Sequence, residues 1–235
     1  MEVSKIILRS IAGKLMSGVM FLAIGSAVCI PAHAIPQNKT QNNASAQRGA
    51  SLTPAEVMKK VVAPIASSSN VQASFTASAG GHNVSGTLKS SDSKFAVTTP
   101  ESSVWFDGKT MWTANHATKE TTITIPDAAE IAATNPLAYI RNYNSDYRLF
   151  FSKRKTPEGK WLVLLNPKKG GTGVKAVEVT VDKVSFTPER LIIRNDDDSV
   201  IQINITKLSH NVTAGPSDFV YPAAKYSSYE VVDLR

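Results

Sequence analysis

The side chains that most often carry out catalysis or bind metals are few in this chain and lie far apart. Beyond the first 34 residues the histidines are His82, His116 and His210, each in a polar stretch near an expected turn. Their spacing matches neither a zinc site nor the tight turn that exposes a catalytic serine in hydrolases. We therefore interpret all three as surface histidines.

Two loop-forming runs resemble ligand-binding motifs but lack residues that those motifs need. Asp196-Asp197-Asp198 offers carboxylates to calcium, but the glycine and the distal glutamate of an EF-hand loop are missing. The run 170–173 is rich in glycine and follows two lysines, yet no Gly-Lys-Ser/Thr sequence and no helix follow it. The chain lacks the pair of carboxylates on adjacent strands that glycoside hydrolysis would need. The sequence predicts a protein that is not an enzyme and has neither metal nor cofactor.

Apolar side chains on β-strands are what the sequence supplies instead. Apolar and polar residues alternate along Val71, Ala73, Phe75 and Ala77, which predicts a strand with one solvent-exposed face. Asp107-Gly108 predicts a two-residue hairpin turn, whose central residues must both tolerate positive φ. Further strands are expected at residues 84–88, 120–125, 147–151, 161–165, 174–181, 190–194 and 200–207. Short turns between them favour an up-and-down antiparallel sheet of about nine to eleven strands.

A few short helices must cover the apolar face of this sheet. Thr53 and Glu56 form a capping box around Pro54, which predicts a helix that Pro64 stops or kinks. A middle segment, 127–143, splits into two short helices. Asp127 with Glu130 caps the first, and Asn135-Pro136 caps the second, which carries Leu137, Ile140 and Tyr143. Short helices over a strongly curved sheet would leave an apolar hollow that suits a lipid.

The N-terminal region predicts export. Three basic residues precede an apolar stretch at 15–30, and Ala32-His33-Ala34 supplies small residues at a cleavage site. We expect a signal peptide at 1–34, cleaved near Ala34, and hence an exported protein. A transmembrane helix is the competing interpretation, but this apolar core is short and ends at Pro31. Cys29 would mark a lipoprotein signal, yet Val28 stands where that signal needs a small residue.

Composition divides the rest of the chain into a tether and one domain. Residues 35–50 are mostly Gln, Asn, Ser and Ala with little to bury, which predicts a disordered polar tether. Residues 51–235 suit a single domain. The leader accounts for 2 of the formal charges of +7, so the mature chain carries about +5. Its basic residues are scattered, which argues against nucleic acid and leaves a weak attraction to anionic membranes or acidic partners.

Several motifs occur in an order that resembles a known family. They are Ala73-Ser74-Phe75-Thr76, Gly86-Thr87-Leu88, Phe95, the hairpin 107–112, Asn135-Pro136-Leu137, Ser145-Asp146-Tyr147 and the closing residues 231–235. Together they resemble the periplasmic outer-membrane lipoprotein carrier family, LolA, from about Ser51 to Arg235. The resemblance implies a mainly β fold, an open, strongly curved antiparallel half-barrel covered by short lid helices. It also implies a carrier that shields the acyl chains of lipoproteins, or a related amphiphile, in an apolar cavity.

The resemblance also implies which residues line that cavity. The candidate lipid-binding residues are Phe75, Leu88, Phe95, Val97, Val104, Phe106 and Met111 on the sheet, with Leu137 and Ile140 on the lid. Periodicity alone does not separate a cavity wall from a packed core, so plain core residues are the alternative. Trp105 and Trp112 are out of phase with this set, so at least one is expected on the outer face, under the opening helix.

One segment departs from the family. Many members carry an Arg-Pro pair just after the Gly-x-Leu strand, and its arginine latches the lid by hydrogen bonds. This chain has Ser90-Ser91-Asp92-Ser93 there. Lid closure would then rely on apolar contacts or on other polar groups.

The partners follow from the resemblance. A carrier of this kind acts as a monomer, receives acylated lipoproteins from an inner-membrane ABC-type release complex and delivers them to an outer-membrane acceptor. It needs no nucleotide of its own. The alternative is an exported envelope interaction or sensor module that has the same half-barrel and carries no lipid. A glycan hydrolase is a third and more distant possibility.

Overall fold

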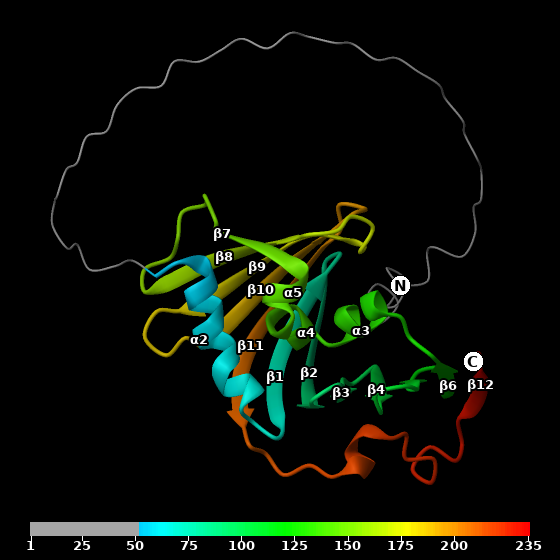
Figure 1. The fold of residues 1–235 in the computed structure, drawn as a ribbon. Helices are drawn as coiled ribbons and strands as arrows, with labels where there is room; N and C mark the ends of the chain where they lie inside the picture. Colours follow the sequence, from blue (N-terminus) through cyan, green and yellow to red (C-terminus); the bar gives the residue numbers. More distant parts are fainter. Residues whose placement is uncertain (1–51) are drawn as a thin grey trace, which may run out of the picture.

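A single curved sheet organises residues 52–235, the part of the chain that the computed structural model describes (Figure 1). Its strands are β1 (Val71–Ala79), β2 (His82–Ser91), β3 (Lys94–Thr98), β4 (Ser102–Phe106), β5 (Met111–Asn115), β6 (Glu120–Thr124), β7 (Tyr147–Phe151), β8 (Lys160–Pro167), β9 (Val174–Asp182), β10 (Pro188–Asn195), β11 (Val200–His210) and β12 (Glu230–Asp233). Their order across the sheet is β12-β6-β5-β4-β3-β2-β1-β11-β10-β9-β8-β7. The end strands β7 and β12 do not pair, so the sheet curves without closing into a barrel.

Local sequence explains where the helices begin. They are α2 (Pro54–Ala66), α3 (Ala128–Thr134), α4 (Leu137–Arg141), α5 (Tyr143–Asp146) and the 3₁₀ helix η1 (Pro216–Phe219). The capping box of α2 is confirmed, because the Glu56 N–H donates to Thr53 Oγ1 and the Thr53 N–H donates to Glu56 Oε2. The box at Asp127 is confirmed for α3. Each box satisfies backbone N–H groups that have no partner within the helix.

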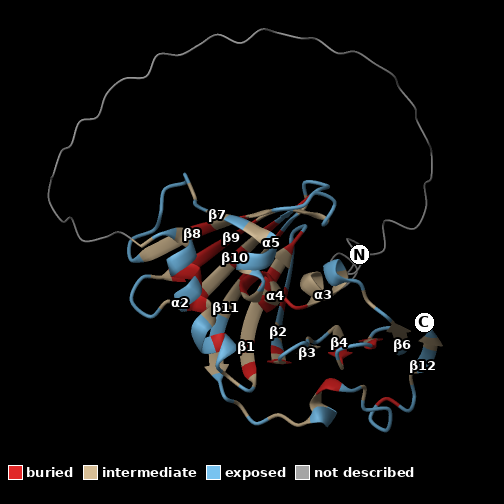
Figure 2. Ribbon diagram, in the orientation of Figure 1, coloured by how far each residue is buried: buried red, intermediate tan, exposed pale blue. Residues whose placement is uncertain are grey.

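Helices α2 to α5 lie on one face of the sheet, and the main core lies between them and the strands (Figures 1 and 2). Val57, Met58, Val61 and Ile65 of α2 are almost wholly buried there. They recur at helical spacing, so one stripe of the helix faces the sheet. The fold is therefore mainly β, an open curved sheet with short helices over its inner face, as the sequence predicted.

The chain that follows β11 covers part of the opposite face of the sheet, over β3 to β6. Trp105 points to this outer face, where its ring lies 5.5 Å from that of Tyr221 and 5.3 Å from that of Tyr226. Trp112 is directly opposite Trp105 on β5 and joins the same cluster. The expectation that a tryptophan lies on the outer face is confirmed, but its cover is this C-terminal segment. Placing it under the opening helix was wrong, because α2 packs on the inner face.

His116 also lies beneath the C-terminal segment. Its ring nitrogens make hydrogen bonds to Ser103 Oγ and to Tyr229 Oη, each 3.1 Å long. Burial, with a smaller contribution from the charge of Lys225, lowers the pKa of His116. The interpretation of His116 as a surface histidine therefore needs correction, since packing of the C-terminal segment leaves its side chain only partly exposed. His82 and His210 are exposed, as predicted.

Two local predictions need correction. The strand β12 runs parallel to β6, although an all-antiparallel sheet was expected. The chain reaches this edge only after crossing the outer face, so its direction is not set by a hairpin. The turn at 107–110 lies one residue later than predicted, because the Asp107 N–H donates to the Thr110 carbonyl and so encloses Gly108 and Lys109 in place of Asp107 and Gly108. Asp107 does not adopt positive φ, unlike Gly108, and its carboxylate accepts from the N–H groups of Lys109 and Thr110.

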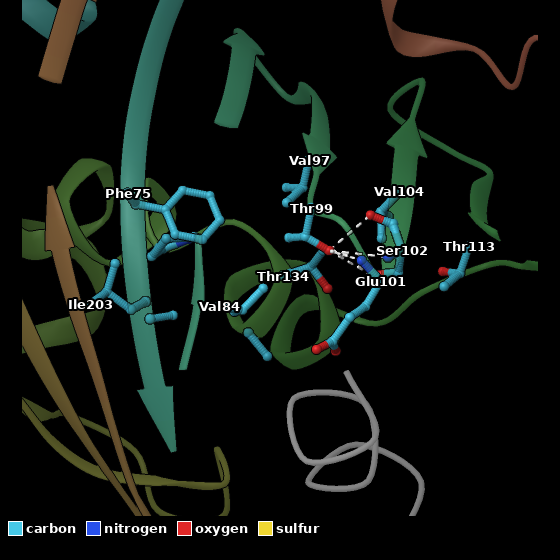
Figure 3. A pocket seen from close by; sticks show the side chains of 13 residues that line it. Phe75, Val84, Val97, Thr99, Glu101, Ser102, Val104, Thr113, Thr134 and Ile203 are labelled. Carbon is cyan, nitrogen blue, oxygen red and sulfur yellow. Dashed lines mark hydrogen bonds between the residues drawn. The ribbon is translucent and has the colours of Figure 1, made fainter. Parts of the chain in front are cut away.

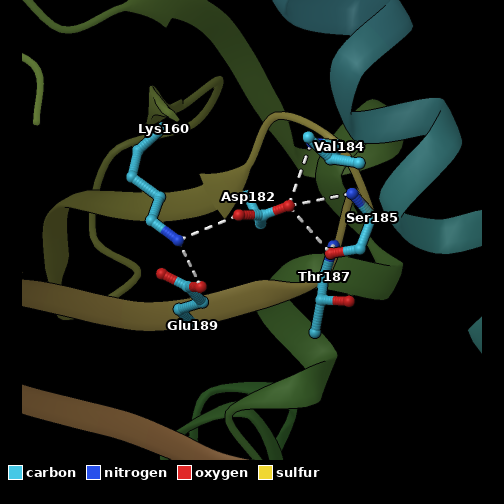
Figure 4. Close-up of polar contacts among 6 residues, drawn as sticks. All are labelled: Lys160, Asp182, Val184, Ser185, Thr187 and Glu189. Atoms are coloured by element: carbon cyan, nitrogen blue, oxygen red, sulfur yellow. Dashed lines mark hydrogen bonds and ion pairs between the residues drawn. The ribbon is translucent and has the colours of Figure 1, made fainter. Parts of the chain in front are cut away.

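A polar cluster fixes the turn between β9 and β10 (Figure 4). Asp182 Oδ1 accepts hydrogen bonds from the backbone N–H groups of Ser185 (2.8 Å) and Val184 (3.0 Å), and Asp182 Oδ2 lies 2.9 Å from Lys160 Nζ. Glu189 binds the same lysine. These contacts, the Ser185 N–H foremost, hold the pKa of Asp182 well below its ordinary value.

This cluster makes stability depend on pH. A carboxyl with a depressed pKa in the folded state stabilises the fold above its unfolded pKa, and that contribution is lost as the pH falls through the folded value. Asp182→Asn should therefore lower the free energy of unfolding at about pH 6, with a smaller difference from wild type at about pH 2.5. Urea denaturation at both pH values measures this. Asp196→Asn, at an exposed turn residue, is the control, and an equal deficit at both pH values would contradict the prediction.

Within the described residues, none of the helices is both long and apolar enough to span a membrane. The expected signal peptide (1–34) and tether (35–50) lie outside the described residues.

Candidate functional site

A pocket opens between the inner face of the sheet and the segment that joins α3 to α4 (Figure 3). Its volume is about 80 Å³. Strands β1 to β5 and β11 form the wall, and the end of α3 forms the cover. The lining residues are Phe75, Ala77, Val84, Val97, Thr99, Glu101, Ser102, Val104, Thr113, Ala133, Thr134, Pro136 and Ile203.

The position of Phe75 in this wall depends on a glycine. Phe75 pairs with Gly86 on the neighbouring strand. A Cβ atom at Gly86 would lie 2.8 Å from Phe75 Cζ and 2.7 Å from the carbonyl oxygen of Thr98. Neither distance is compatible with a side chain. Glycine at 86 thus lets the Phe75 ring lie against the sheet and form part of the pocket.

Polar groups gather where β3 turns into β4, at one side of the pocket. Thr99 Oγ1 donates to the Ser102 carbonyl (3.0 Å) and accepts from the N–H groups of Glu101 (3.3 Å) and Ser102 (3.0 Å). The hydroxyl therefore fixes the turn. Glu101 Oε2 is buried but has no hydrogen-bond partner within residues 52–235.

The structure divides the predicted lipid-binding residues into two groups. Phe75, Val97 and Val104 line the pocket. The others are at most 4% exposed and belong to the packed core under α4: Leu88, Phe95, Phe106, Met111, Leu137 and Ile140. In this conformation those six side chains pack against protein, as the rings of Phe95 and Phe106 do at 5.2 Å.

The sequence prediction missed ten of the lining residues. Ala77, Val84 and Ile203 share the inner face with Phe75 and Val97, so the same alternation would have identified them. The polar residues at 99, 101 and 102 lie in or next to a turn, where side chains do not alternate between two faces as they do along a strand. Nor does any local signal show that the α3–α4 junction, with Thr134 and Pro136, reaches this part of the sheet.

Helix α4 fills the middle of the inner face. Leu137, Tyr139 and Ile140 are all buried, and α4 also packs against α2. The Asn135 side chain accepts a hydrogen bond from the Leu137 N–H, which supports the predicted role of Asn135 at the start of this helix. The ring of Tyr139 lies edge-on to that of Tyr147 at 6.4 Å, and burial raises the pKa of Tyr147 to about 12.

Arg141, the last residue of α4, joins this helix to the sheet. Its Nη1 donates to Ser90 Oγ (3.0 Å) and to the carbonyl oxygen of Asp92. Ser90 is fully buried and donates in turn to the Lys94 carbonyl. Burial lowers the pKa of Arg141, and the charge of Asp92 acts in the opposite direction. The segment that lacks the arginine of the family thus accepts hydrogen bonds from an arginine on the helix.

A family of known proteins matches most of this chain. The family model described as "Outer membrane lipoprotein carrier protein LolA" matches residues 44–197. The chain belongs to this LolA family. The matched range includes strands β1 to β10 and helices α2 to α5. It ends before β11 and the C-terminal segment.

Three solved structures are similar to this chain at low sequence identity. An uncharacterized conserved protein from Thermus thermophilus gives a TM-score of 0.50 at 12% identity, covering 76% of this chain and 98% of that one. A DUF1329 family protein from Desulfovibrio piger gives a TM-score of 0.46 at 12% identity, covering 73% of this chain and 98% of that one. A LolA superfamily protein from Nitrosomonas europaea gives a TM-score of 0.40 at 11% identity, covering 73% of this chain and 99% of that one. The comparison with curated proteins found no match.

Proposed function

We propose that this LolA-family protein is a non-enzymatic carrier that shields an acyl chain of a lipoprotein, or of a related amphiphile, between the sheet and helix α4. One observation carries the proposal. An apolar pocket lies beside a short helix that fills the middle of the inner face and is joined to the sheet by Arg141. We call α4 the lid.

The size of the pocket supports a lid that moves. A cavity of about 80 Å³ holds about five to eight water-sized groups. An acyl chain has about fifteen methylenes and gains about 0.8 kcal/mol for each one sheltered from water, or about 12 kcal/mol in all. The pocket as it stands takes only part of such a chain. If Leu137 and Ile140 leave the inner face, the apolar surface of Leu88, Phe95, Phe106 and Met111 becomes available for the remainder.

A lid and a cargo that replace each other on the inner face also suit a carrier that must release what it binds. The lid and the acyl chain would compete for the same apolar surface, so closing of the lid offsets part of the cost of release. The family membership supports a periplasmic monomer that receives acylated lipoproteins from an inner-membrane ABC-type complex and passes them to an outer-membrane acceptor. Cleavage of the leader near Ala34 belongs to the same proposal, as does the division into a tether and a domain at residue 51.

Lipid uptake tests the proposal directly. The purified protein should take a fluorescent acyl lipid from water in a saturable way, with one chain bound per protein. Ala133→Leu adds carbon atoms at the pocket wall and should weaken uptake about threefold to tenfold, because the added atoms occupy space that the chain needs. Ala128→Leu, at an exposed position on the same helix, is the matched control. Uptake that is absent in the wild type, or unaffected by Ala133→Leu, would contradict the proposal.

An exported interaction or sensor module is the second candidate, and the edge strand β7 favours it. Phe150 is 48% exposed and Phe151 36% exposed on this strand, whose outer edge is unpaired within the described sheet. An unpaired edge with apolar side chains is a template on which a partner protein can add a strand. Failure of the wild-type protein to take up any acyl lipid would favour this candidate.

A further inference from the structure

The pocket has one charged group in its wall, and that group lacks a partner. Among the thirteen lining residues only Glu101 carries a charge, and its Oε2 atom is buried without a hydrogen bond from any described residue. In Figure 3 the side chain extends away from the turn and ends in a carboxylate that no dashed line reaches. The rest of the wall is apolar or carries hydroxyl groups.

The backbone holds Glu101 in this position. Its N–H donates to Thr99 Oγ1 (3.3 Å), and its carbonyl accepts from the His116 N–H (2.9 Å). The turn therefore fixes the backbone of Glu101, and the carboxylate extends from it to the pocket without a hydrogen bond from any described residue. A buried acceptor without a donor is unfavourable, so its retention beside a pocket points to a ligand that supplies the donor.

The chemistry of a carboxylate restricts what this ligand can be. An ionised carboxylate only accepts hydrogen bonds, and bonds to an ionised acceptor are the stronger kind. A head group with an N–H donor therefore complements it, whereas a phosphate, sulfate or carboxylate head group is repelled. An alkylammonium carries its N–H groups at the end of the hydrocarbon chain, and an N-acyl amide carries its N–H one carbonyl carbon away from the chain.

We propose that Glu101 selects amphiphiles whose head group carries an N–H donor next to the acyl or alkyl chain. The chain enters the apolar part of the pocket, between Phe75, Val97 and Val104, and the N–H binds the Glu101 carboxylate. This inference rests on the proposed carrier function and specifies which cargo that function takes. An N-acylated amino terminus has the required chemistry.

Three probes of equal chain length test the selection, each measured by isothermal titration calorimetry below its critical micelle concentration. Dodecylammonium and N-methyldodecanamide carry an N–H, and N,N-dimethyldodecanamide does not. The wild-type protein should bind each of the first two about tenfold more tightly than the third, the ratio that one hydrogen bond to a charged acceptor gives. Binding of the amide alone, or of the ammonium alone, in preference to the third probe identifies which source of N–H the site takes.

Two substitutions separate this selection from a general effect on the protein. Glu101→Leu should bind all three probes with similar affinity, and Glu120→Leu, at an exposed residue of β6, should retain the preference. Glu101→Leu removes a carboxylate oxygen, Oε2, that is buried without a hydrogen bond from a described residue, so its thermal midpoint should equal or exceed that of the wild type. Glu101→Gln, which keeps the shape of the side chain, should bind dodecylammonium about tenfold more weakly than the wild type.

The outcomes distinguish this inference from the carrier function itself. Equal affinity for all three probes in the wild type, or a preference that survives Glu101→Leu, would overturn the role of Glu101 and leave acyl-chain binding intact. Failure of all three probes to bind would overturn the acyl-chain pocket as well.

Discussion

Arg141→Met should release the lid while the sheet remains folded. Arg141 makes two hydrogen bonds from α4 to the sheet, to Ser90 Oγ and to the Asp92 carbonyl. Hydrogen bonds of charged groups contribute about 1.5 to 3 kcal/mol each, and methionine keeps an unbranched apolar stem and the helix propensity of the side chain without donating. Protection of the α4 amides against hydrogen exchange should fall about tenfold to a hundredfold.

Hydrogen exchange followed by mass spectrometry measures this effect, and the amides of β8 and β9 serve as the internal reference. Arg148→Met, at an exposed position on β7, is the matched control. A more open lid should also speed both uptake and release of a fluorescent acyl lipid. Unchanged protection in α4 would show that apolar contacts alone hold the lid, and that Arg141 has no part in closing it.

The second large effect is a difference in stability between a core residue of the sheet and a core residue of the lid. Phe95→Ala should lower the free energy of unfolding by about 3 to 5 kcal/mol, because Phe95 is fully buried in β3 and packs against Phe106. Leu137 is 1% exposed, so burial alone predicts a comparable loss for Leu137→Ala. If the lid opens separately from the sheet, Leu137→Ala cannot lower the free energy of unfolding by more than the free energy with which α4 closes.

Guanidinium denaturation of the two variants tests this difference. Phe95→Ala should shift the main transition, and Leu137→Ala should leave most of it in place while α4 loses its protection against hydrogen exchange. If the two variants lose the same stability in one cooperative transition, α4 is part of the core. The proposal of a movable lid would then fail.

Local sequence determined much of this fold because its signals act within a few residues. The capping boxes at Thr53 and Asp127 satisfy backbone groups three residues away, so they mark the starts of α2 and α3 wherever the chain packs. Alternation along residues 71–77 assigned Phe75 and Ala77 to one face of β1, because successive side chains of a strand point to opposite faces. The same signals fail where an outcome depends on distant residues. The cover over Trp105, the partial burial of His116 and the parallel pairing of β12 all require the C-terminal segment to cross the outer face.

The candidate site shows the same division. Periodicity placed Val97, Val104 and Phe95 on the inner face, and the resemblance to the LolA family indicated what such a face can do. Only the tertiary structure separates pocket wall from packed core, because that depends on how far Leu137 and Ile140 reach across the sheet. Arg141 meets Ser90 across 51 positions of sequence, and Glu101 lies beside a pocket that helix α3 completes from a separate part of the chain. Such contacts are fixed by the packing of whole elements, for which neighbouring residues carry no signal.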